Sequence, residues 1–217
     1  MTIAITDAIP TLAEAEQRFN LARTEDEAFF PEGQSNLLDL AGTEQTALDE
    51  LRRRYLYQRS LGQLLEGTVM LLLVSPLLAI AGFYDPPFQV RAEESVQLTL
   101  NDGEEVLQGR IDVLVLLDQF WVVVLESKKT ALSVWTALLQ TLAYLMANPQ
   151  IDYPEGGTAS HRPSFGMVTN GDDILFVKLV QTESRRYALS RVFAPLTSRQ
   201  ELYSVLQILK RMSQAIV

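Results

Sequence analysis

The fold is decided by one stretch of sequence, GRIDVLVLLDQFWVVVLESK, which runs from residue 109 to residue 128. It contains two valine-rich apolar runs typical of neighbouring strands, with Asp112 near the start of the first and Glu126 at the end of the second. Burial of an ionised carboxylate costs on the order of several kcal/mol unless a cation or hydrogen-bond donors compensate it. Two such carboxylates followed by Lys128 therefore indicate a metal site.

The phase of the predicted hairpin decides whether these side chains can meet. Glu126 and Lys128 are two residues apart, so they share one face of a regular strand. Asp112 lies directly opposite Glu126 only if Leu117 pairs with Trp121, which leaves a three-residue loop. A two-residue loop would shift Glu126 to the other face unless a β-bulge restored the phase.

The available ligands favour a hard divalent cation. The chain has no cysteine, so a metal would be held by oxygen atoms or by the single His161, which has no histidine partner at metal spacing. Mg²⁺ takes oxygen ligands and keeps several waters, so we expect Asp112 and Glu126 to hold it. The carbonyl of Ser127 is a further candidate ligand. Lys128 is placed to orient or deprotonate a water there.

The bulk composition fits one globular domain with an extension before it. The chain has 217 residues, of which 47% are hydrophobic and 21% charged. We predict a helical N-terminal extension over residues 1–60 and the main domain over residues 61–217. The N-terminus does not resemble a secretory signal, and the longest apolar stretch, Val69 to Ala81, is too short to span a bilayer. A soluble cytoplasmic protein that does not enter a membrane is therefore expected.

The net charge of −9 argues against a generic, strongly basic nucleic-acid binder. It leaves room for a metal centre, which needs carboxylates, beside a local basic strip. The candidates for such a strip are Arg52-Arg53-Arg54 with Arg59, Lys128-Lys129, and Arg185-Arg186 with Arg191. Runs of this kind are more often solvated faces than binding grooves.

The alternation and spacing of apolar residues predict an α/β (α+β) fold, in which helices flank a central mixed β-sheet. Pro76 should kink or divide one long apolar helix, and Trp121 and Trp135 should lie in the core. The expected helices cover 43–59, 61–81, 131–147 and 198–216, and the expected strands cover 88–100, 105–117, 121–127, 165–169, 174–180 and 187–193.

Two motifs on the predicted hairpin resemble a known family. Gly109-Arg110-Ile111-Asp112 followed by Glu126-Ser127-Lys128-Lys129 is similar to the PD-(D/E)xK nuclease superfamily, and more narrowly to the N-terminal nuclease domain of type I restriction enzyme R subunits. Ile111 stands where the family usually has proline. The resemblance implies a restriction-endonuclease-like core in the main domain.

Two further elements match the same relatives in order and spacing. Upstream, Glu66 precedes Pro76-Leu77-Leu78 and Gly82-Phe83. Downstream, Gln140 and Tyr144 resemble the family's Q-x-x-x-Y element, and a spacing of four sets them on one helix face, away from the Leu138 and Leu142 stripe.

The resemblance implies a restriction-type endonuclease that hydrolyses DNA with Mg²⁺, or with Mn²⁺ in its place. Glu66 would join Asp112 and Glu126 in the acidic metal shell. Gln140, Tyr144 and Lys129 would support the site or touch the substrate. Separate restriction-modification subunits are the implied partners, and two cuts by a single-site fold would favour a homodimer. The sequence has no G-x-x-x-x-G-K-[ST] loop, so the ATP-driven motor of such enzymes is not expected in this chain.

Two other classes of protein stay open. One is a non-catalytic nucleic-acid-binding or interaction module that kept the nuclease fold, which the acidic composition favours. The other is a structural domain in which Asp112 or Glu126 forms a salt bridge with Lys128 or Arg110. In that case Glu66 would be an ordinary acid at a helix start, and Gln140 with Tyr144 would only pack between helix and sheet.

Overall fold

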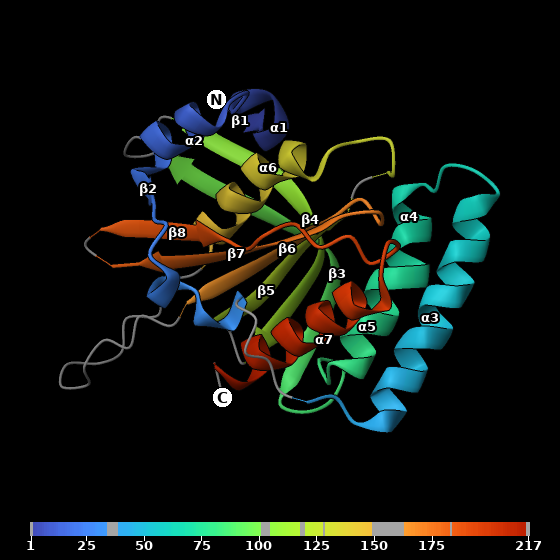
Figure 1. Cartoon of the computed structure of the whole chain (residues 1–217). Coiled ribbons are helices and arrows are strands. Elements are labelled where there is room, and N and C mark those ends of the chain that lie inside the picture. The colour runs from blue at the N-terminus through green and yellow to red at the C-terminus, as the bar shows by residue number, and fades with distance from the viewer. Residues whose placement is uncertain are drawn as a thin grey trace.

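The computed structural model describes residues 2–33, 39–100, 105–117, 120–127, 129–148, 163–182 and 184–215, and for 120–127 the description covers the backbone. One mixed sheet forms the centre, with strand order β1-β4-β5-β6-β7-β8-β2 and with β3 paired to β4 (Figure 1). Its strands are β1 Thr2–Ala4, β2 Leu21–Arg23, β3 Phe88–Leu100, β4 Glu105–Leu117, β5 Phe120–Ser127, β6 Ser164–Thr169, β7 Ile174–Gln181 and β8 Arg185–Leu189.

Helices cover both faces of this sheet, which gives a three-layer α/β fold consistent with a restriction-endonuclease-like core (Figure 1). This confirms the predicted fold class. The helices are α1 Ile5–Ala8, α2 Leu12–Phe19, α3 Gly42–Ser60, α4 Glu66–Val69, α5 Ser75–Ile80, α6 Val134–Met146 and α7 Arg199–Gln214, with a π-helical turn at Met70–Val74 and 3-10 turns at Glu27–Phe29 and Pro31–Gly33.

The two faces of the sheet have separate cores. Helices α3, α5 and α7 pack on one face, and α1, α2 and α6 pack on the other. Along β7, for example, Ile174 and Phe176 belong to the first core, whereas Leu175 and Val177 belong to the second. This is the alternation that a strand buried on both sides requires.

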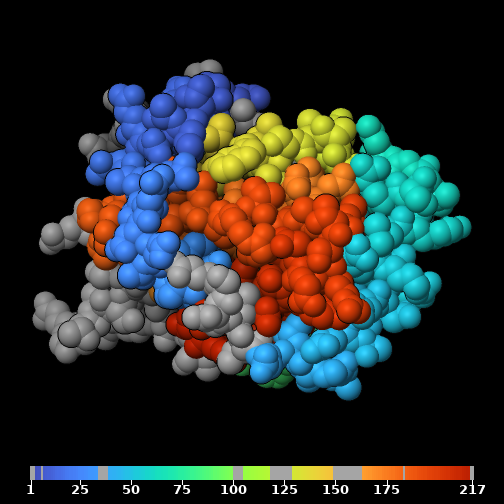
Figure 2. Space-filling model, in the orientation of Figure 1, coloured from blue at the N-terminus to red at the C-terminus, as the bar shows by residue number. Residues whose placement is uncertain are grey.

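Residues 2–33 contribute strands as well as helices, which the sequence did not predict. β1 pairs in parallel with β4, and β2 pairs in parallel with β8. In Figure 2 this N-terminal segment, in blue, lies across the orange strands near β8. Both strands have three residues, too few for an alternating pattern to be recognised in the sequence. The division of the chain at residue 60 stays a prediction.

The predicted long helix over residues 61–81 begins later and is divided. The helical segment starts at Glu66, and the π-helical turn lies immediately before Ser75-Pro76. Proline has no N–H to donate, so a change in the hydrogen-bond ladder at this point is expected. The segment ends before Gly82, whose φ of 86° lies in the left-handed region that glycine favours.

One core prediction is wrong. Trp135 has 48% of its surface exposed in the first turn of α6, one turn before the buried Leu138. Leu138 and Leu142 belong to the core on that face of the sheet. The described helices include none that is both long and apolar enough to cross a membrane.

Candidate functional site

Two of the acids singled out in the sequence line one cavity. Glu66 at the first turn of α4 and Asp112 in β4 border a hollow of about 310 Å³. Gly67, Met70, Glu93 and Arg110 also line it. Glu66 is exposed and Asp112 is partly buried, so both carboxylates belong to a surface that a ligand can reach.

Glu66 owes its place to the way its helix begins. Leu65, immediately before α4, has an extended backbone with φ of −78° and ψ of 160°, and the helix starts with the next residue. An acid in the first turn interacts favourably with the positive end of the helix dipole. The chain before it is held by Thr130, whose N–H donates to the carbonyl of Leu64 at 3.2 Å.

The strand that bears Asp112 is interrupted beside it. β3 and β4 pair regularly up to Ala92 with Val113 and again from Glu94 with Ile111, in the same register, so Glu93 and Asp112 face each other at the gap. Glu93 has a φ of 56°, which is strained for a residue with a side chain. Such backbone strain is common at functional sites.

The interruption also reverses the direction of the side chains along β4. Ile111 lies in the core beneath α6, whereas Val113, two residues later, lies in the core beneath α3 and α5. In a regular strand these two side chains would share a face. Asp112 therefore stands at the point where the strand changes faces, and it is partly buried between two fully buried neighbours.

The β4–β5 register sets the backbone of Glu126 against that of Asp112. Leu117 pairs with Phe120, which excludes the three-residue loop and leaves the two-residue alternative, and the register shifts between Val115 and Leu116. Beyond this bulge Val113 pairs with Leu125, and the same register continued by one residue sets Glu126 opposite Asp112. This is the two-residue loop with a phase-restoring bulge. Lys128, His161 and the two connecting residues 118–119 lie outside the described residues.

The Q-x-x-x-Y element holds the strand that carries Asp112. The hydroxyl of Tyr144 accepts from the Arg110 amide at 3.1 Å and donates to the Arg110 carbonyl at 2.9 Å. Gln140 donates to the same hydroxyl from one helical turn earlier. Tyr144 is 1% exposed and lies in the same core as Leu138, so the expectation that it points away from that stripe is wrong.

The basic strips proposed from the sequence are largely engaged within the protein. Arg59 pairs with Asp172, and Arg191 pairs with Glu201. Arg53 and Arg54 both pair with Glu50, Arg52 bonds to backbone carbonyls at 195 and 196, and Arg185 bonds to the carbonyl of Phe19. Lys129 is exposed in the connection after β5. At the cavity itself, Nη1 of Arg110 lies 3.6 Å from Oε2 of Glu93.

The donor set at the cavity fits a hard cation. Its acidic oxygens come from Glu66, Asp112 and Glu93, and its lining includes neither histidine nor cysteine. Within the residues that the structure describes, no cluster of three or more acidic or histidine side chains is close enough to hold a metal ion. Any such site would therefore need the Glu126 carboxylate or ligands supplied by substrate and water.

The sequence did not single out Glu93 for this cavity. Nothing in its local pattern distinguishes it from the other polar residues of β3, because the feature that matters is its backbone conformation. The sequence suggested Arg110 only as a salt-bridge partner of Asp112 or Glu126, whereas in the structure its guanidinium pairs with Glu93.

Comparison with known proteins gives one structural resemblance. A fragment of a putative HsdR subunit of a type I restriction enzyme from Vibrio vulnificus YJ016 is similar over 64% of this chain, with 21% sequence identity and a TM-score of 0.38. The match spans 25% of that protein's chain. No protein-family model matches the sequence, and a search of curated proteins gives no match. The resemblance is partial, and functional inference rests on the residues around the cavity.

Proposed function

We propose that this protein is a Mg²⁺-dependent DNA endonuclease of restriction type, with Mn²⁺ as an alternative cation. The observation that supports this most is the convergence of Glu66 and Asp112 on one cavity, beside the β-bulge that sets the Glu126 backbone opposite Asp112. Carboxylates from a helix start and from two neighbouring strands are a suitable source of oxygen ligands for a cation that also touches phosphate.

In this proposal Glu66, Asp112 and Glu126 hold the cation together with the carbonyl of Ser127. When bound, the cation would lower the pKa of a water and offset the charge that develops on the phosphate. Lys128 would orient that water or take its proton, and exposed Lys129 would contact a phosphate of the DNA. Gln140 and Tyr144 would act through Arg110, by holding β4 in place.

The partners proposed for the chain follow from the same function. DNA is the substrate, separate restriction-modification subunits would direct it, and a homodimer would allow two cuts. Such a protein would work in the cytoplasm. Most arginines of the basic strips already bind carboxylates or carbonyls of the protein, so we expect binding to depend on the cavity and its cation more than on a broad basic surface.

The test is cleavage of supercoiled, linear and single-stranded DNA with Mg²⁺ or Mn²⁺, together with calorimetric titration of Mn²⁺. Asp112→Asn, Glu126→Gln and Lys128→Ala should each abolish or strongly reduce nicking, and the two acid variants should lower Mn²⁺ affinity by about 10-fold or more. Glu25→Gln, an exposed acid elsewhere, is the matched control. Equal nicking by native protein and Lys128→Ala would show that a contaminant cuts the DNA.

A second candidate is a non-catalytic interaction module that keeps the fold. It is favoured by two exposed apolar side chains, since Leu65 and Leu71, the chain neighbours of the lining residues Glu66 and Met70, each have 69% of their surface exposed. This candidate predicts that the native protein neither cuts DNA nor binds Mn²⁺ measurably. Detectable Mn²⁺ binding that Asp112→Asn removes would count against it.

A further inference from the structure

The turn that follows β6 lies beside the cavity-bearing segments. β5 and β6 are parallel, and Ser127 at the end of β5 is the register partner of Thr169 at the end of β6. The chain then turns through residues 170–173 into β7. We call residues 169–173 the Asn170 turn. Because neighbouring parallel strands end at the same edge of a sheet, this turn lies beside the end of β5, the strand that carries Glu126.

The Asn170 turn is fixed by its own side chains. The Asn170 side-chain oxygen accepts from the amides of Asp172 at 3.0 Å and Asp173 at 2.7 Å. The Thr169 hydroxyl accepts from the Gly171 amide at 2.9 Å and donates to the Asp173 carbonyl at 2.8 Å. Asn170 is 5% exposed and Thr169 is 1% exposed, so these bonds are shielded from water.

The turn reaches the connection between β5 and α6. The Asn170 amide group donates to the carbonyl of Leu132 at 2.7 Å. Two residues earlier in that connection, Thr130 exchanges two bonds with Leu64: its hydroxyl accepts from the Leu64 amide at 3.3 Å, and its own amide donates to the Leu64 carbonyl at 3.2 Å. Leu64 precedes Glu66 by two residues, and Thr130 follows Lys128 by two.

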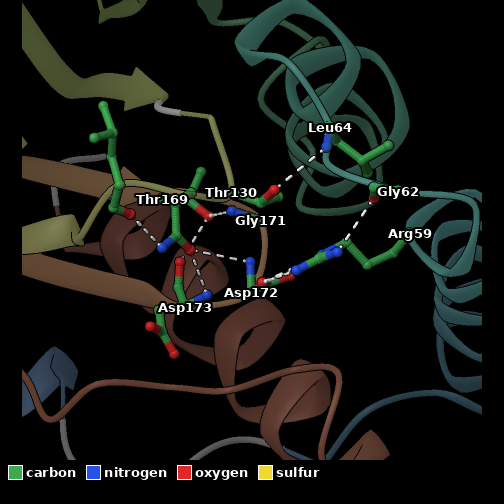
Figure 3. A network of polar contacts seen from close by, with 10 residues as sticks. Arg59, Gly62, Leu64, Thr130, Thr169, Gly171, Asp172 and Asp173 are labelled. Atoms are coloured by element: carbon green, nitrogen blue, oxygen red, sulfur yellow. Dashed lines mark hydrogen bonds and ion pairs between the residues drawn. The ribbon is translucent and has the colours of Figure 1, made fainter.

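A second set of hydrogen bonds, made by Arg59, holds the segment before Glu66 at Gly62. Arg59 donates to both carboxylate oxygens of Asp172 at 2.9 Å and to the carbonyl of Gly62 at 3.2 Å (Figure 3). The hydrogen bond to Asp172 raises the pKa of Arg59, and burial raises the pKa of Asp173, with the neighbouring charge of Asp172 adding to it. Gly62 thus binds Arg59, which pairs with Asp172 of the Asn170 turn, and Leu64 binds Thr130 in the β5–α6 connection.

We propose that Thr130 and Asn170 are positioning residues that set the Glu66-bearing helix start against the end of β5, the strand whose last two residues are Glu126 and Ser127. This proposal rests on the nuclease function proposed above. Ligands that come from two separate segments must keep a fixed separation to share one cation. Here the segment before Glu66 and the connection after β5 do not belong to one strand, and the hydrogen bonds of Thr130 to Leu64 and of Asn170 to Leu132 link them. Neither residue lines the cavity.

The test compares Thr130→Val with Thr130→Ser. Valine has nearly the shape of threonine but cannot accept from the Leu64 amide, whereas serine keeps the hydroxyl. We expect Thr130→Val to weaken Mn²⁺ binding about 10-fold and to lower kcat for plasmid nicking by at least as much, with little change in KM for DNA. Faster amide exchange over residues 62–69 should accompany this loss. Thr130→Ser should restore all three measurements most of the way to native values.

A matched control is Thr141→Val, which removes another buried hydroxyl, one that donates to the Ala137 carbonyl within α6. It should leave Mn²⁺ affinity unchanged. Asn170→Asp is a second test variant. It keeps the side-chain oxygen that accepts from the amides of Asp172 and Asp173, but it removes the N–H that donates to the Leu132 carbonyl. It should reproduce the Thr130→Val losses even where that variant folds poorly.

Two outcomes separate the failure of this proposal from the failure of the nuclease function. A native protein that neither binds Mn²⁺ nor cuts DNA overturns both. A native protein that does both, with Thr130→Val and Asn170→Asp equally able, overturns only the positioning role. Losses in Thr130→Val that Thr130→Ser does not recover would also count against it, because they would arise from the change of shape and not from the missing bond.

Discussion

The Tyr144 hydroxyl bonds to both backbone groups of Arg110, accepting from its N–H at 3.1 Å and donating to its carbonyl at 2.9 Å. On this edge of β4, strand β1 pairs with residues 106–108 and β5 pairs from Val113 onward. The tyrosine thus serves as the partner of the strand in the interval between them. Two residues later comes Asp112, so a side chain from α6 holds the backbone on which the proposed site depends.

Tyr144→Phe should therefore destabilise the protein and disturb the site. Loss of the hydroxyl leaves the Arg110 amide and carbonyl without this partner, at a cost of about 1–3 kcal/mol in the free energy of unfolding. Urea unfolding measures that cost. Tyr203→Phe, which removes an exposed hydroxyl that donates to Asp49, should cost much less. Equal effects of the two substitutions would mean that the bonds to Arg110 are unimportant.

Gly109 should not tolerate even a methyl group. A Cβ there would lie 2.6 Å from Cε1 and 2.8 Å from the hydroxyl oxygen of Tyr144, and 3.0 Å from Cδ1 of Ile5. Gly109→Ala is expected to lower the free energy of unfolding by about 1–3 kcal/mol, since neither ring nor strand can move freely in a packed core. Gly42→Ala in α3, where a Cβ meets nothing within 4 Å, should be neutral or slightly stabilising. A stable, fully active Gly109→Ala would contradict this.

The ion pair between Lys178 and Glu32 should respond differently to single and double substitution. Its side chains are 10% and 13% exposed, the nitrogen and oxygen are 2.8 Å apart, and the Lys178 ammonium lies 5.7 Å from the centre of the Phe165 ring. Glu32→Gln leaves a buried cation poorly compensated and should cost about 3 kcal/mol. Adding Lys178→Met should recover most of that loss in thermal or urea unfolding. A double variant as unstable as Glu32→Gln alone would exclude this explanation.

Acid should weaken the attachment of α7 at its N-terminus. Hydrogen bonding by Arg191 holds the pKa of Glu201 below its ordinary value of 4.5, against the opposing effect of partial burial. A carboxylate whose folded pKa is lowered contributes stability that is fully present above its unfolded pKa and is lost as the pH falls through the folded pKa. Because Arg191 is largely exposed, the contribution is about 0.2–1 kcal/mol.

The measurement is urea unfolding of native protein and Glu201→Gln at pH 7 and at decreasing pH below about 4.5. The native protein should be the more stable at pH 7, and the difference should shrink as the pH falls. A difference that stays constant, or grows, in acid would show that Glu201 stabilises the protein by packing.

Long periodic elements were predictable from the sequence, and the reasons are local. The bounds of β3 and β4 match the predicted 88–100 and 105–117, because polar and apolar residues alternate in the second half of β3 and β4 ends in a valine-rich apolar run. Thr11 caps α2, with its hydroxyl accepting from the Glu14 amide at 3.2 Å, which is a role typical of threonine before a helix. The arrangement of helices around a mixed sheet followed from these elements.

The features that bring the site together were harder to predict, because they depend on tertiary contacts. The β4–β5 bulge was one of two arrangements that could set Asp112 opposite Glu126, and only the pairing of Leu116 with Trp121 reveals it. The positive φ of Glu93 could not be predicted, because glutamate is not a residue type that favours this conformation. The bond from the Asn170 amide group to the Leu132 carbonyl joins segments 38 residues apart, so no local pattern in the sequence reveals it. Metal binding and the roles of Glu66, Asp112, Glu126 and Lys128 stay predictions.

The parallel pairing of β2 with β8 has a consequence for aggregation. β2 covers the backbone of residues 185–187 at the end of the sheet, and the amide of Thr24 continues the cover with a 2.9 Å bond to the Tyr187 carbonyl. If the N-terminal segment were removed or displaced, β8 would become an open edge able to accept a strand from another molecule. The three residues of β2 thus shield the β8 edge of the sheet from pairing with another molecule.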